Sequence, residues 1–178
     1  SRSYLQMDRT VRQLATHLSK KVSDRLASLY TNEKEAFLAA WPDIEMIVKL
    51  GMLQDDKFYE RSKDFLVWKN LAGEWTTAED YLARHKEDYK GKIFYTSDDK
   101  HTPHFLDLYK EKGIEVLQAG SPVDTPLMNL LEGKLENAQF QRIDGALDEA
   151  ILDTTREKTL LDAEGKTESV RLADFVRS

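Results

Sequence analysis

The sequence predicts an α/β fold, which is α+β when the chain is taken as a whole. A connector of three helices is expected first, followed by a small three-layer sandwich with a three-stranded, mainly parallel sheet. Apolar residues recur every three or four positions before residue 70, as on one face of a helix. After residue 86, short β-type runs alternate with helical segments. The 40% of hydrophobic and 33% of charged residues are typical of a globular protein with a well-solvated surface.

The first helix of the connector is indicated by a long amphipathic pattern. From Thr10 onward, apolar residues are spaced three or four apart, while the basic residues fall largely on the other side. The apolar set is Val11, Leu14, Leu18, Val22, Leu26 and Leu29.

Two further helices follow. Asn32 is expected to cap the second, with Glu35 in the capping-box position, and the helix should run to about Leu50 and end at Gly51. Asp55 is expected to cap the third. A helical bundle over residues 8–70 is therefore predicted.

Strands and helices then alternate. Thr77 resembles the start of a short helix, and a polar hinge leads into the first β-type run. The runs are KIFYT at 92–96, IEVLQ at 114–118 and AQFQRI at 138–143, separated by helices at 104–112 and at 124–135, the latter capped by Asp124. Short links between alternating elements predict parallel pairing of the three strands.

Charge and composition argue against nucleic-acid-binding, membrane-spanning and disulfide-bonded classes of protein. Residues 1–25 carry six basic and two acidic side chains, a charge of +4, which leaves −10 for the rest of a chain whose total is −6. No nucleic-acid partner is expected for such a chain. No apolar stretch is long enough to cross a membrane, and with no cysteine there are no disulfides; the cytoplasm is the expected compartment.

The sequence contains no clear motif for binding phosphate or a metal ion. No glycine-rich phosphate loop is present. His101 and His104 lie beside Asp98 and Asp99 and could supply metal ligands, but a solvated helix start explains them better, so no metal is predicted. The two aspartates would lie at the carboxyl edge of the sheet, where such folds often bind ligands, although a turn with helix-start charge is again the favoured interpretation.

Several stretches resemble the HtpG chaperones, the bacterial form of the ninety-kilodalton heat-shock proteins. They are SRSYLQ at the start, then W-x-x-I, GMLQDDKFYERSKDFLVWKN, TTAEDYLARHK, KIFYTSDDK, KEKGIEVL and SPVDTPLMNLLEGKLENAQFQRID. The resemblance covers residues 1–145 and is loose beyond Asp144. It implies a fragment of a longer protein, namely the later part of the middle domain.

The resemblance also implies a domain plan. Residues 1–7 would be the remnant of a catalytic loop, 8–85 a helical connector, 86–143 the small α/β sandwich lobe, and 144–178 a linker with the start of the C-terminal domain. Members of this family are homodimeric clamps that use ATP and Mg²⁺, bound mainly by an N-terminal domain. The fragment alone is expected to be monomeric, to hold no cofactor and to lack ATPase activity, with client proteins and its own neighbouring domains as partners.

Site residues follow from the same resemblance. In this family an S-R-x-x-L-Q segment reaches the bound ATP when the clamp closes, and Arg2 and Gln6 match its working positions. A guanidinium aimed at the γ-phosphate would neutralise charge during phosphoryl transfer. Met128 and Asn129 match client-binding positions, but Pro126 stands where the well-known bacterial form has an aromatic residue.

Two alternatives remain open. One is a stand-alone, receiver-like α/β domain or small enzyme that uses the sheet edge at Asp98 and Asp99. The other is an adaptor whose basic helix at 9–25 docks an acidic partner.

Overall fold

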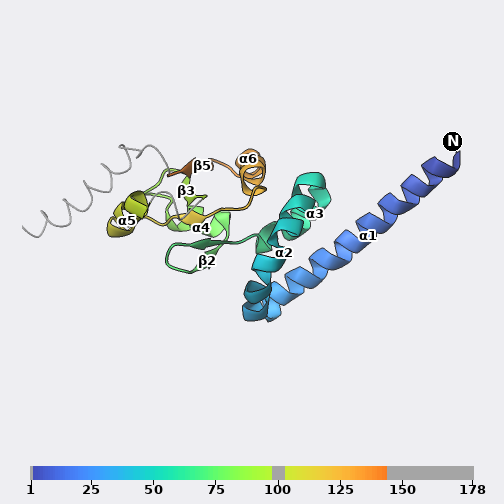
Figure 1. Ribbon diagram of the computed structural model, residues 1–178, viewed down its shortest axis with the longest axis horizontal. Coiled ribbons are helices and arrows are strands. Elements are labelled where there is room, and N and C mark those ends of the chain that lie inside the picture. Colours follow the sequence, from blue (N-terminus) through green and yellow to red (C-terminus); the bar gives the residue numbers. More distant parts are fainter. Residues whose placement is uncertain (1, 98–102, 144–178) are drawn as a thin grey trace, which may run out of the picture.

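The computed structural model describes residues 2–97 and 103–143, and these form two parts (Figure 1). The first is a helical arm, residues 2–65, and the second is a sheet lobe, residues 68–143. One continuous hydrophobic core joins them, from Phe37 in the arm to Ile143 at the end of the lobe. Within the described residues, no helix is long and apolar enough to span a membrane.

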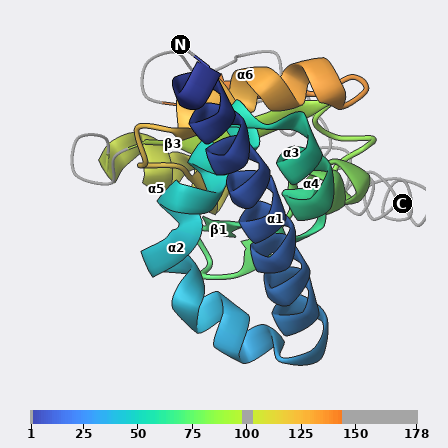
Figure 2. The same cartoon turned by 90° about the vertical axis from the view of Figure 1, so that its right-hand side faces the viewer.

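The arm contains three α-helices and a short 3-10 helix: α1 (Arg2–Asn32), α2 (Lys34–Gln54), α3 (Asp56–Ser62) and η1 (Lys63–Phe65). Figure 2 shows α1 crossing over α2 and α3. Stacked and edge-on rings fasten the arm together, with centroids 5.1 Å apart for Tyr30 and Phe37, 5.3 Å for Phe37 and Trp41, and 5.6 Å for Phe37 and Phe65. Such pairs add roughly 0.5–1.5 kcal/mol each beyond the area they bury.

Two predicted helix boundaries in the arm are wrong. Asn32 is the last residue of α1 and does not cap α2, whose N-cap is Glu33 and makes no side-chain capping bond. Gly51 lies inside α2 and does not end it. A Cβ at Gly51 would come within 2.9 Å of the Phe58 ring, so this glycine is explained by the close approach of α3. The predicted cap Asp55 is confirmed, since its carboxylate accepts from the Lys57 amide at 2.9 Å.

The described part of the lobe has five strands, where the sequence predicted three. They are β1 (Trp68–Asn70), β2 (Trp75–Thr76), β3 (Lys92–Thr96), β4 (Leu117–Gln118) and β5 (Gln139–Arg142), in the order β2-β1-β4-β3-β5. The predicted parallel pairing is confirmed, because β3 runs parallel to both β4 and β5. The two added strands are antiparallel and fall in the range predicted as helical.

These two strands were missed because they are only three and two residues long, too short to show a period of two. The turn between them contains Gly73, which has φ +85° and donates its amide to the Asn70 carbonyl at 3.0 Å.

Among the described residues, three helices accompany the sheet: α4 (Ala78–Arg84), α5 (Pro103–Glu111) and α6 (Asp124–Lys134). Thr77 caps α4 as predicted, accepting from the Asp80 amide at 3.2 Å. Asp124 does not cap α6; it is the first helical residue, after Val123. Adjacent residues Ile93 and Phe94 point to opposite faces of β3 and are both fully buried, so the sheet is covered on both faces. The predicted mixed α+β class is confirmed.

Candidate functional site

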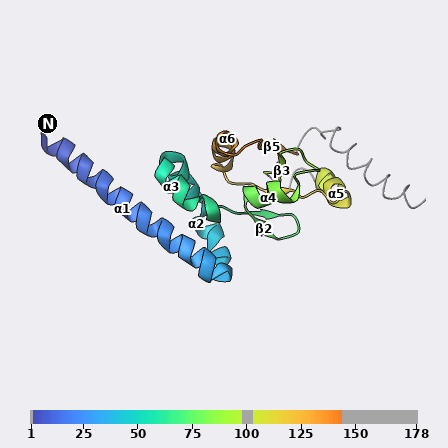
Figure 3. The ribbon, with the colours of Figure 1, turned by 180° about the vertical axis from the view of Figure 1, so that it is seen from behind.

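Arg2 and Gln6 lie in the first two turns of α1, at the end of the helix farthest from the lobe (Figure 3). Both side chains are exposed. This segment was expected as a loop but is helical, and the Gln6 carbonyl accepts a hydrogen bond from the Thr10 hydroxyl at 2.9 Å. The arrangement presents a guanidinium at the tip of a 31-residue helix.

The part of α1 before Ser23 has an apolar face that is not buried against the other described elements. Its predicted apolar face is present, yet Val11, Leu14 and Leu18 are each more than half exposed. The first buried residue of the helix is Ser23, and only the last two turns join the core. Asp8 and Arg12, an exposed pair at 3.1 Å, add little to the stability of this stretch.

The predicted client residues Met128 and Asn129 differ in burial on α6. Met128 is 2% exposed and packs in the core with Leu127 and Leu131. Asn129 is exposed, as is Pro126 one turn earlier. Asn129 is therefore accessible on the surface of α6, whereas Met128 packs beneath it. The N-terminal end of α1, which carries Arg2, lies far from α6 (Figure 1).

A buried ion pair joins the arm to the lobe and was not found from the sequence. Lys49 in α2 is 1% exposed, and its ammonium lies 2.6 Å from Asp124 Oδ1 and 3.1 Å from Glu45 Oε2. Asp124 also accepts from the Trp68 indole at 3.2 Å and from the Ser121 amide at 3.0 Å. The Glu45–Lys49 spacing of four is visible in the sequence, but it predicts an exposed pair on a helix surface.

A second polar cluster surrounds Glu115 in the lobe. Its carboxylate accepts from Asn70 at 2.8 Å and from Arg84 at 2.9 Å, and it lies 2.7 Å from His85 Nε2. Burial alone would raise the pKa of this carboxyl, yet the hydrogen bonds from His85, Asn70 and Arg84 lower the pKa to about 2. The His85 ring stacks on Tyr89 with centroids 4.1 Å apart.

An open groove of about 480 Å³ runs beside this cluster, lined by Asn70, Trp75, Arg84, Lys110 and Glu115 among others. Its strongest polar groups already satisfy one another. The Tyr81 hydroxyl donates to the Glu115 carbonyl at 2.6 Å, and the Glu115 amide donates to the Tyr89 hydroxyl at 2.9 Å. The cluster therefore joins α4, β1 and the segment before β4, and we assign it a structural role.

Within the described residues, no group of three or more acidic or histidine side chains could hold a metal ion. Asp98, Asp99 and His101 lie outside the described residues, and so does the side chain of His104. The hypotheses built on these four residues stay untested.

Comparison with known proteins connects the whole chain to one family. The family model described as "Hsp90 protein" matches residues 1–178. The chain is 31% identical to the chaperone protein HtpG of Bacteroides fragilis over 169 residues, 92% of this chain and 25% of that protein. It is 34% identical to HtpG of Porphyromonas gingivalis over 149 residues, 81% of this chain and 22% of that protein.

A third relative, HtpG of Bdellovibrio bacteriovorus, is 30% identical over 187 residues, which covers 100% of this chain and 29% of that protein. The chain thus spans about a quarter of the length of the curated relatives that it matches. Since the family model extends over the complete sequence, including the residues beyond 145 where the resemblance looked loose, the chain belongs to the Hsp90 family of proteins.

Proposed function

We propose that this chain is a middle-domain segment of an ATP-dependent molecular chaperone that assists the folding of client proteins. The match of the Hsp90 family model to all 178 residues carries this proposal. Names of the relatives support it, because each is called a chaperone protein. The full-length protein would be a cytoplasmic homodimer, whereas this segment alone would be a monomer without ATPase activity.

Arg2 would act on ATP held by another domain. Its exposed guanidinium stands at the N-terminal end of α1, well away from the lobe. A positive charge brought to the γ-phosphate only on closure would stabilise the transition state more than the ground state and would couple hydrolysis to conformation. Gln6 lies one turn further along the same helix and would assist in positioning.

Client proteins would contact the exposed face of α6. Asn129 supplies an amide with two donors and an acceptor, and Pro126 lies beside it. The buried Met128 would hold this face in place. Because Pro126 adds little apolar area for a partner to cover, the α6 face would bind clients weakly.

The test is made on the full-length protein that contains this chain. ATP affinity and single-turnover hydrolysis are measured before and after Arg2→Ala, with Arg9→Ala as the matched control because Arg9 is an exposed arginine on the same helix. Hydrolysis should fall about tenfold or more for Arg2→Ala, a barrier increase of about 1.4 kcal/mol, with ATP affinity nearly unchanged. Equal hydrolysis in both variants would rule out the role of Arg2.

A further inference from the structure

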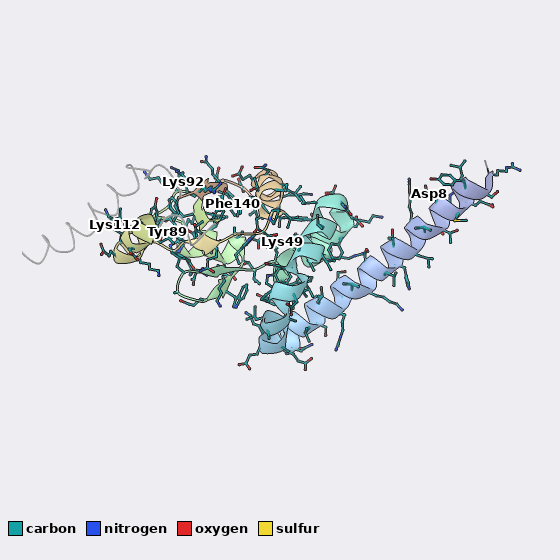
Figure 4. The ribbon with its side chains drawn as sticks, in the orientation of Figure 1. Asp8, Lys49, Tyr89, Lys92, Lys112 and Phe140 are labelled. Atoms are coloured by element: carbon teal, nitrogen blue, oxygen red, sulfur yellow. The ribbon has the colours of Figure 1, made fainter. Side chains whose placement is uncertain are left out.

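The buried pair of Lys49 and Asp124 lies at the junction of the two parts of the molecule. Figure 4 places Lys49 on the side of α2 that faces the lobe. Asp124 is the first residue of α6, and α2 and α6 pack against each other. The Lys49 ammonium also lies 5.5 Å from the centre of the Trp68 ring, so α2, β1 and α6 meet at this point.

Three hydrogen bonds fix the orientation of the Asp124 carboxylate. Oδ1 accepts from Lys49 and from the Trp68 indole, and Oδ2 accepts from the Ser121 amide. With Lys49 1% and Asp124 2% exposed, only a narrow range of positions keeps both charges paired. A buried pair of this kind often adds little net stability compared with apolar residues, but it penalises strongly any geometry that separates the charges.

The opposite end of α6 is tied to the arm much more loosely. There, Lys134 lies 3.4 Å from Asp56 of α3, and the Asp56 side chain is 82% exposed. The Lys134 ammonium also approaches the Tyr59 ring, at 4.9 Å from its centre. An exposed pair at this distance restricts motion weakly. Of these two ion pairs between α6 and the arm, the buried one is strict and the exposed one is loose, and α6 also packs against α2.

We propose that Lys49 and Asp124 are positioning residues whose ion pair sets the angle between α2 and α6. The pair holds the face of α6 that carries Asn129 in a fixed relation to the arm that carries Arg2. Movement of the arm is thereby transmitted to that face rather than absorbed at the junction. The consequence for clients rests on the proposed function, but the geometry itself does not.

The first experiment measures this geometry in the 178-residue chain. Because the chain has no cysteine, Glu35→Cys in α2 and Gly133→Cys in α6 provide a unique pair of spin-label sites, both exposed, and Gly133 has open space around a Cβ. Double electron–electron resonance then gives the distribution of distances between the labels. The test variant is K49M/D124N, which removes both charges and keeps one acceptor oxygen for Trp68.

The matched control is K134M/D56N, the same change at the loose end of α6. We expect a narrow distribution in the parent chain and in the control, and a distribution about twice as wide in K49M/D124N, with thermal unfolding showing that it is folded. A folded K49M/D124N chain with an unchanged distribution overturns the proposal. If that variant does not fold, K49Q/D124N, which removes both charges but keeps a hydrogen-bond donor at position 49, decides by the same criterion. Failure of both variants to fold would overturn the positioning role and show a folding role instead.

A second readout separates this proposal from the proposed function. Reduced, carboxymethylated α-lactalbumin, which stays unfolded, is titrated against the parent chain, K49M/D124N, K134M/D56N and Asn129→Ala. Weaker binding is expected for K49M/D124N and Asn129→Ala but not for K134M/D56N. If Asn129→Ala binds as the parent does, the client surface is wrong while the distance result stands; an unbroadened distance distribution removes only the positioning role.

Discussion

The residue directly before β3 must be a glycine, because the fold leaves no room there for a side chain. Gly91 has φ +83°, and a Cβ there would come within 1.9 Å of the Asn137 carbonyl oxygen. The Gly91 carbonyl also accepts from the Gln139 amide at 2.9 Å, so β3 and β5 are joined at this residue. No side-chain rotation relieves a clash with a backbone atom.

Gly91→Ala should therefore lower the free energy of unfolding by about 3 kcal/mol or more. Gly113→Ala is the control, because Gly113 also has positive φ, +69°, but nothing lies within 4 Å of its Cβ position. That change should cost only about 1–2 kcal/mol, from the backbone conformation alone. Urea unfolding of both variants measures the difference, and equal losses would mean that the strands shift to accommodate the methyl group.

Charge at Glu115 makes stability depend on pH. The pKa of this carboxyl is about 2 in the folded chain against an ordinary value of 4.5, so the folded state favours the charged form. Its contribution is present above pH 4.5 and is lost as the pH falls towards 2. After allowance for solvent screening, it should be roughly 1–2 kcal/mol.

Glu115→Gln removes this contribution, and its stability should fall less steeply than that of the parent between pH 4.5 and pH 2. Urea unfolding at several pH values gives the two slopes. Parallel slopes would place the acid sensitivity in other carboxylates. Asp107→Asn is a suitable control, since Asp107 is exposed.

At the scale of the element, two adjacent residues of α6 are expected to affect different properties, one the stability of the fold and the other the binding of clients. Met128→Ala removes a buried side chain and should lower the free energy of unfolding by about 2–5 kcal/mol. Asn129→Ala is exposed and should change it by no more than about 0.5 kcal/mol. Thermal unfolding and titration with the unfolded α-lactalbumin should therefore respond to different members of this adjacent pair, and a binding loss with Met128→Ala alone would contradict this division.

Sequence patterns predicted the elements whose signals are local. Strand β3 was predicted with its exact bounds, and the caps Asp55 and Thr77 were found, because strand composition and capping depend on neighbouring residues. The buried ion pair of Lys49 was missed because its partner Asp124 is 75 residues away in the sequence. Arg2, Gln6, Met128 and Asn129 came from resemblance alone, and no local pattern distinguishes the buried Met128 from its exposed neighbour.

At the scale of the whole molecule, the arm and the lobe differ in how much each part buries. The lobe and the helices α2 and α3 share one core, whereas α1 contributes to it only from Leu26 onward among its apolar residues. The exposed apolar residues Leu5, Val11, Leu14 and Leu18 lie along the remaining length. Stability should therefore be uneven along the chain even though the helix is continuous.

Most helical stability in proteins comes from tertiary packing, and isolated helices shorter than about 12–15 residues are marginal in water. The part of α1 before Ser23, residues 2–22, is longer than this limit, but none of its residues is buried. In the isolated chain, amides of residues 4–18 should exchange with deuterium about 100-fold faster than those of residues 37–52 in α2. Hydrogen-exchange mass spectrometry measures both segments in one experiment. Equal protection that survives dilution would mean that the stretch is stable by itself, whereas protection lost on dilution would mean that a second copy covers its apolar face.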